Sequence, residues 1–243
     1  PNAPGPHPVL VFIHGGGWYQ GNLDTAEVEM GSLPELAECV GVSVEYRLAP
    51  EHPFPTPLQD CAAAYDWTLA HAAELGIDVS RLAIAGTSAG GNLAAALCVL
   101  LRDTGRPLPI VQLLDVPATD LTLSSPSVEQ VATGAGLTKE ATTHYATTYL
   151  GGADPRDPLA SPLFADLTGV PPAVVIVAEN DPLRDDGERF LRRLHEHGVA
   201  AAGFRVLAQF HGSWIVPITV TSRLVPDIRV ATLRRAFATS LTP

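Results

Sequence analysis

The segment that most constrains this chain runs from Gly86 to Asn92 and reads GTSAGGN. An apolar stretch at 82–85 precedes it and an apolar, small-residue stretch at 93–97 follows it, which predicts a strand, a sharp turn and a helix. A Gly-x-Ser-x-Gly pattern also occurs in ordinary loops, but between a strand and a helix it is typical of a nucleophile elbow. The turn strains the serine backbone, and flanking glycines let strand and helix approach closely. The pattern therefore predicts that Ser88 is an exposed nucleophile.

A serine hydroxyl needs a histidine base and an orienting carboxylate, which in this kind of fold follow in the order acid, then histidine. A buried-strand pattern at 172–178 is followed by Asp181, and a strand-like pattern at 204–207 is followed by His211. Because open α/β sheets collect functional groups at the carboxyl ends of their strands, both residues are expected at the same edge. We predict Asp181 as the acid and His211 as the base.

Three other carboxylates near Asp181 stay open as alternative acids, namely Glu179, Asp185 and Asp186. The last two stand at the start of a helix predicted to run to about His197. Carboxylates at that position commonly cap the helix or face solvent, so Asp181 is preferred.

A second glycine-rich segment, His14-Gly15-Gly16-Gly17-Trp18, follows the predicted strand at 9–13. Three successive glycines are often a flexible turn, but here they occur together with the elbow and the base. Acyl transfer needs preorganised N–H donors for the oxyanion that forms on a carbonyl. Gly16 and Gly17, with the amide of Ala89 next to the nucleophile, are predicted to supply them.

Five segments together resemble the bacterial hormone-sensitive-lipase-like carboxylesterases of the α/β-hydrolase superfamily, and they lie at 14–18, 46–55, 86–94, 181–185 and 211–212. The resemblance runs from about Pro8 to the end of the chain. It implies hydrolysis of short- to medium-chain acyl esters through a serine acyl-enzyme, without a cofactor or metal. The residues that it implies are a catalytic triad of Ser88, Asp181 and His211 and an oxyanion hole of Gly16, Gly17 and Ala89. An amidase, deacetylase or acyltransferase using the same triad is the alternative, followed by a non-catalytic small-molecule receptor.

The chain departs from the family pattern at three places. Thr87 stands where the family usually has an acidic residue, which is expected to weaken a hydrogen-bond network below the oxyanion loop. Ser213 and Trp214 follow the His-Gly pair where relatives commonly have Phe, and are expected to reshape one pocket wall. Relatives also carry an N-terminal extension with lid helices, whereas this chain begins almost at the oxyanion strand, so a wider cleft is expected.

Strand and helix patterns alternate along the 243 residues, which predicts an α/β fold with a mostly parallel central sheet flanked by helices. The resemblance specifies this as the α/β-hydrolase fold. A single domain over 1–243 is expected. At about 117–170 the pattern loosens into Ser, Thr, Pro and Gly with one helix near 138–150, and this segment is predicted to be a lid insertion.

Fifteen basic against 26 acidic residues leave a net charge of −11, which disfavours nucleic acids and anionic membranes as partners. The predicted partner is a small-molecule ester, and a homo-oligomer is left open.

The sequence shows no apolar run of about 18 residues and no signal-peptide pattern at its start, so neither a membrane span nor a leader is expected. Cys39, Cys61 and Cys98 are predicted to be buried free thiols, which favours the cytoplasm. His195 and His197 point apart on a helix and predict no metal site.

Overall fold

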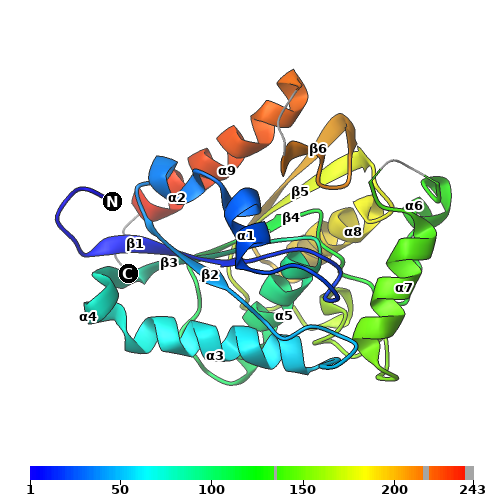
Figure 1. The fold of residues 1–243 in the computed structure, drawn as a ribbon, viewed down its shortest axis with the longest axis horizontal. Helices are drawn as coiled ribbons and strands as arrows, with labels where there is room; N and C mark the ends of the chain where they lie inside the picture. The colour runs from blue at the N-terminus through cyan, green and yellow to red at the C-terminus, as the bar shows by residue number, and fades with distance from the viewer. Residues whose placement is uncertain (134–135, 216–218, 239–243) are drawn as a thin grey trace.

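The computed structural model describes residues 1–133, 136–215 and 219–238. Within these residues six strands form one sheet in the order β2-β1-β3-β4-β5-β6, and every neighbouring pair is parallel (Figure 1). The strands are β1 (His7–Ile13), β2 (Val40–Val44), β3 (Ile77–Thr87), β4 (Val111–Asp115), β5 (Ala173–Asn180) and β6 (Ala201–Phe210). The predicted α/β fold with a parallel central sheet is confirmed.

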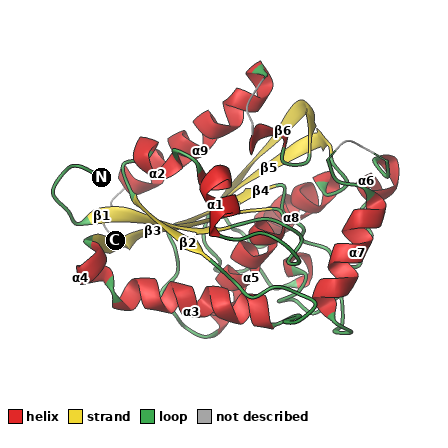
Figure 2. Ribbon diagram, in the orientation of Figure 1, coloured by secondary structure: helices red, strands yellow, loops and turns green. Residues whose placement is uncertain are grey.

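Helices cover both faces of the sheet (Figure 2). One face packs against α1 (Leu23–Met30), α2 (Leu33–Leu36) and α9 (Val220–Ala238), and the other against α3 (Thr56–Ala70), α5 (Ala89–Asp103) and α8 (Arg184–Glu196). The remaining helical segments are α4 (Ala72–Leu75), α6 (Pro126–Gln130), α7 (Lys139–Leu150), η1 (Pro162–Phe164) and η2 (Ser213–Ile215). Because side chains alternate along a strand, Val11 and Ile13 enter one core while Leu10 and Phe12 enter the other.

The strands expected from the sequence are all present, and the predicted helix near 138–150 is α7, whose N-cap Thr138 accepts a hydrogen bond from the N–H of Ala141. Four helices were not predicted, namely α1, α4, α6 and α9. Helix α1 is short and weakly amphipathic, and α9 carries Pro226 in its interior. Helix α2 is a single turn, and the Ser32 side chain before it makes no capping hydrogen bond.

The strand order places the site. Strand β1 pairs with β2 on one side and with β3 on the other, so the direction in which the sheet grows reverses at β1. Ligands of open α/β sheets bind at such a switch point, beyond the carboxyl ends of the strands. Ile13 is in register with Gly86, so the loop after β1 and the turn after β3 lie next to each other.

The elbow at the end of β3 is built on two contacts that a side chain would prevent. A Cβ on Gly86 would lie 2.2 Å from the carbonyl oxygen of Gly90, and a Cβ on Gly90 would lie 2.0 Å from the carbonyl oxygen of Ile13. The intervening Ser88 has φ 57° and ψ −117°, a conformation that L-residues rarely adopt. Glycine at both positions therefore permits the strained turn.

Within the described part of the chain, no helix is both long and apolar enough to cross a bilayer.

Substitution of Gly90 by Ala should destabilise the protein by about 3 kcal/mol or more, because the methyl group would overlap backbone atoms that cannot move independently. Chemical denaturation measures the free energy of unfolding. The control is Gly105→Ala, where the new Cβ would meet no described atom within 4 Å and only the positive φ of 65° opposes it. The control should cost about 1 kcal/mol. Equal losses in the two variants would contradict the packing argument.

Candidate active site

Ser88 lies at the tip of the turn between β3 and α5, as predicted. Its backbone N–H donates to the carbonyl oxygen of Asp115 at the end of β4, with an N–O distance of 2.8 Å. This bond fixes the turn against the neighbouring strand. Ala89 follows as the first residue of α5, where the first N–H groups of a helix have no partner within it.

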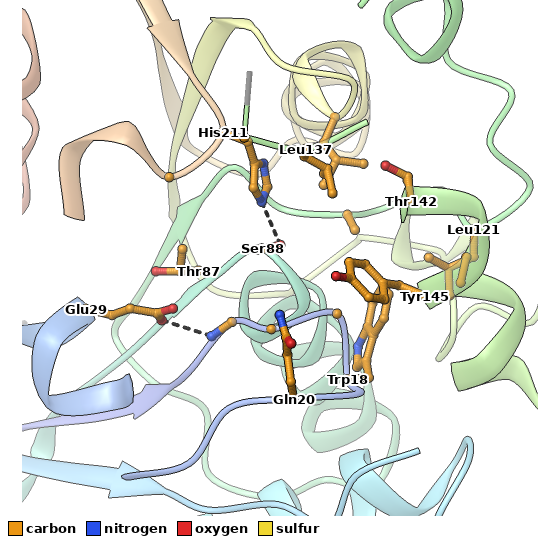
Figure 3. A pocket seen from close by; sticks show the side chains of 18 of the residues that line it. Trp18, Gln20, Glu29, Thr87, Ser88, Leu121, Leu137, Thr142, Tyr145 and His211 are labelled. Carbon is orange, nitrogen blue, oxygen red and sulfur yellow. Dashed lines mark hydrogen bonds between the residues drawn. The ribbon is translucent and has the colours of Figure 1, made fainter. Parts of the chain in front are cut away.

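The structure brings Ser88, His211 and Asp181 into one hydrogen-bonded chain. Nε2 of His211 lies 2.9 Å from Oγ of Ser88 (Figure 3), and Nδ1 lies 2.8 Å from Oδ2 of Asp181. Asp181 is fully buried, and its other oxygen accepts the N–H of Leu183 at 2.9 Å. A buried carboxylate with these partners holds the imidazole in one orientation and tautomer.

Two of the alternative acids are engaged elsewhere. Glu179 accepts the N–H of Ala208 at 2.8 Å, and Asp185 accepts the N–H of Ser127 at 2.9 Å. Asp185 also pairs with Arg184. Among the described residues, the groups that contact the carboxylates of Glu179 and Asp185 are therefore others than the His211 imidazole.

Asp186 is 1% exposed and binds backbone N–H groups of the loop after β4, so the expectation that it caps the helix or faces solvent is wrong. Its carboxylate accepts the N–H groups of Thr119 and Asp120, each at 3.1 Å, and the Ser125 hydroxyl. Burial raises the pKa of Asp186 to about 7, against the effect of the Ser125 hydrogen bond. This residue anchors the loop after β4 to α8.

The glycine loop after β1 reaches the same pocket. Gly16 and Gly17 have φ of 115° and 62° and line the cavity beside Ser88. A Cβ on Gly16 would lie 2.1 Å from the carbonyl oxygen of Gln20, so the close turn requires glycine there.

Tyr46 supports this loop from below. Its hydroxyl donates to the carbonyl oxygen of His14 at 2.9 Å, and its ring stacks on the His14 ring with centroids 4.3 Å apart. His14 is fully buried, and burial lowers the pKa of its imidazole. Tyr46 opens the segment at 46–55, and through these contacts it holds the start of the glycine loop after β1.

A carboxylate contacts the glycine loop after β1 although the residue before Ser88 is Thr87. The N–H of Gly15 donates to Oε2 of Glu29 at 2.9 Å (Figure 3). Glu29 belongs to α1, and burial raises its pKa to about 7. Sequence reasoning missed Glu29 because no periodic pattern marked α1, and no motif links it to the elbow.

The cavity above Ser88 measures about 250 Å³. Apolar and aromatic side chains form one side of it, including Trp18, Leu121, Leu137 and Tyr145, while Glu29 and Thr87 lie on the other (Figure 3). The segment expected to be the lid contributes Thr142, Tyr145 and Ala146 of α7.

Trp18 and Trp214 lie in different places. Trp18 is 3% exposed, stacks on Tyr149 with centroids 4.5 Å apart and also lines the cavity. Trp214 packs into the core below, and Ile215 reaches the cavity instead. Neither Ser213 nor Trp214 lines the cavity, so the expectation that they reshape one pocket wall is wrong.

No group of three or more His, Cys, Asp or Glu side chains within the described ranges is arranged to hold a metal ion. The three cysteines are buried free thiols, as predicted.

Comparison with known proteins identifies relatives over most of the chain. The model of a family described as having the alpha/beta hydrolase fold matches residues 10–215. The chain is 43% identical over 208 residues to the carboxylic ester hydrolase LipN of Mycobacterium tuberculosis, covering 82% of this chain and 55% of LipN. It is 41% identical over 232 residues to an arylesterase of Saccharolobus solfataricus, covering 94% of this chain and 75% of the arylesterase.

Among solved structures, an esterase from the bacterial hormone-sensitive lipase family superimposes with a TM-score of 0.89 at 37% identity, covering 95% of this chain and 77% of that one. The chain thus spans only a little over half the length of LipN and about three quarters of the other two relatives. On the family match, these identities and the shared architecture, the chain belongs to the hormone-sensitive-lipase-like esterase family of the α/β-hydrolase superfamily.

Proposed function

We propose that this chain carries the catalytic site of a carboxylesterase that hydrolyses short- to medium-chain acyl esters through a serine acyl-enzyme. The observation that carries the proposal is the continuous contact from Asp181 through His211 to Ser88, at the floor of a cavity with apolar walls. The relatives named carboxylic ester hydrolase and arylesterase support it. A non-catalytic receptor would have no need of a serine within 2.9 Å of a histidine that is itself held by a buried carboxylate.

In the first half of the reaction, Oγ of Ser88 attacks the ester carbonyl while Nε2 of His211 takes its proton. Asp181 accepts the hydrogen bond from Nδ1 and stabilises the imidazolium that forms. The N–H groups of Gly16, Gly17 and Ala89 bind the oxyanion. His211 then returns the proton to the leaving alcohol, and the acyl-enzyme remains.

In the second half, water takes the place of the alcohol. His211 accepts a proton from the water as its oxygen attacks the acyl carbon, and the proton is returned to Oγ of Ser88 when the carboxylic acid leaves. Every atom and proton is accounted for by ester, water and these side chains. No cofactor enters the scheme.

The cavity favours a small, neutral acyl group. A volume of about 250 Å³ holds a chain of a few carbons, and Leu121, Leu123 and Leu137 offer it apolar contacts. Asp120 also borders the cavity, but its carboxylate is paired with Arg189 at 2.8 Å, so its negative charge is neutralised by the guanidinium.

Amide hydrolysis and acyl transfer would use the same acyl-enzyme, so activity assays are needed to distinguish them from ester hydrolysis. A cytoplasmic location and a homo-oligomer remain predictions.

Replacing Ser88 by Ala should lower kcat by about 10⁴-fold or more while leaving thermal unfolding unchanged, since the loss is of a reacting atom rather than of packing. A fluorescent alkyl phosphonate should label the parent protein at Ser88 and should not label the variant. Ser80→Ala, at an exposed serine in the same strand, is the control and should keep full activity. Phosphonate labelling at another serine would refute the assignment.

Asp181→Asn should lower kcat by about 10³- to 10⁴-fold, because an amide does not hold the imidazole in the active tautomer. Asp185→Asn and Asp186→Asn should each keep kcat within about tenfold. Asp186→Asn should instead lower the unfolding temperature, since its carboxylate ties a buried loop to α8. Steady-state kinetics and calorimetry on the three variants test this, and an inactive Asp185→Asn beside an active Asp181→Asn would show that the acid is misassigned.

Across p-nitrophenyl esters from acetyl to palmitoyl, kcat/KM should be highest at acyl chains of about two to eight carbons, since each further CH₂ gains about 0.8 kcal/mol only while it is buried. The p-nitroanilides of the same acids serve as the amide comparison and should react far more slowly. A maximum at palmitoyl, or faster cleavage of anilides than of esters, would contradict the proposed substrate class.

A further inference from the structure

Glu29 is a buried carboxylate at the active site that the reaction scheme does not use. It lies on α1, is 8% exposed and borders the cavity. Its Oε2 accepts the N–H of Gly15, the residue that precedes the two glycines of the oxyanion loop (Figure 3). The hydrogen bond therefore acts on the backbone immediately before the proposed oxyanion donors.

The Glu29 carboxylate also lies where the oxyanion loop meets the nucleophile elbow. A Cβ built on Gly15 would lie 3.0 Å from the carbonyl oxygen of Thr87, 3.1 Å from Oε1 of Glu29 and 3.4 Å from Cβ of Ser88. These atoms come from the turn after β3 and from α1, and they all lie against Gly15. The Glu29 side chain therefore occupies the space between the glycine loop and the nucleophile elbow and keeps the two apart.

The backbone of Glu29 is itself anchored. Arg229 of α9 is buried, and its Nη1 donates to the carbonyl oxygen of Glu29 at 3.1 Å. Its Nε lies 3.3 Å from Oδ2 of Asp115, whose own carbonyl oxygen accepts the N–H of Ser88. The contacts run from Gly15 through Glu29, Arg229 and Asp115 to the nucleophile, so both sides of the oxyanion hole are tied to the same buried arginine.

We propose that Glu29 is a positioning residue that holds the N–H groups of Gly16 and Gly17 where the oxyanion forms. The proposal rests on the proposed esterase function. The glycine backbone has high conformational freedom, and N–H donors stabilise a transition state only when their positions are fixed before the reaction. A carboxylate accepts a stronger hydrogen bond from an N–H than a neutral acceptor does, which suits it to this task.

Burial raises the pKa of Glu29 to about 7, while the Gly15 N–H and the charge of Arg229 work to lower it. Asp115 of β4 also faces the carboxyl and raises its pKa, and His211 lowers it. The carboxylate form therefore predominates at about pH 8, which is the condition for the test.

The test compares Glu29→Leu, which removes the acceptor, with Glu29→Gln, which keeps one. At pH 8, Glu29→Leu should lower kcat by about 10- to 100-fold and change KM by less than about twofold, because the loss concerns the transition state. The Ki of a trifluoromethyl ketone, which forms an oxyanion on Ser88, should rise by the same factor as kcat/KM falls. Glu29→Gln should stay within about fivefold of the parent. Glu27→Gln, at an exposed position of the same helix, should match the parent in every measurement.

The proposal is overturned if Glu29→Leu keeps its kcat, if KM rises as much as kcat falls, or if Gln restores no more activity than Leu. Circular dichroism reports folding, and if the Leu variant is unfolded, Glu29→Met is judged by the same criteria. The rate of phosphonate labelling at Ser88 separates this proposal from the proposed function. A parent that labels rapidly but cleaves no ester refutes the esterase function, whereas an unchanged labelling rate in Glu29→Leu refutes the role of Glu29.

Discussion

The site depends on the close approach between the start of α5 and the end of β1. At Gly90 the backbone is so near the carbonyl oxygens of Ile13 and His14 that a Cβ would lie 2.0 and 2.5 Å from them. This contact sets how far Ser88 lies from the glycine loop after β1. It also forces the strain at Ser88, since the chain must reverse between β3 and α5 within a few residues. Packing on both faces of the sheet holds the contact closed.

Buried polar groups then hold the two loops in position. His14 stacks on Tyr46, whose hydroxyl reaches back to the loop, and Glu29 accepts the N–H of Gly15 from the other side. Burying polar groups is costly unless they find partners, and Tyr46 and Glu29 find theirs in the backbone of the loop after β1.

The pocket wall beyond the nucleophile depends on a second set of buried contacts. Asp186 on α8 binds two N–H groups of the loop after β4, and Arg189 on the same helix pairs with Asp120. Burial tends to raise the pKa of Asp120, but hydrogen bonds from Ser124 and Thr122 and the contact with Arg189 hold it below its ordinary value. This loop carries Leu121 and Leu123 into the cavity, so α8 helps to define what the pocket accepts.

The sequence by itself determined the features that follow from local pattern. These are the strand, turn and helix around Ser88, the alternation that requires a parallel sheet, and the position of Asp181 and His211 directly after two strands. The need for glycine at 86 and 90 was predictable from the sequence because backbone geometry at a tight turn excludes other residues.

What only the tertiary structure decided depends on contacts between distant segments. Glu29 and Arg229 are 200 residues apart in the chain, and neither belongs to a motif. The burial of Asp186 and the direction of Trp214 were likewise unreadable, because local propensity does not specify which side of a helix or loop the rest of the fold will cover.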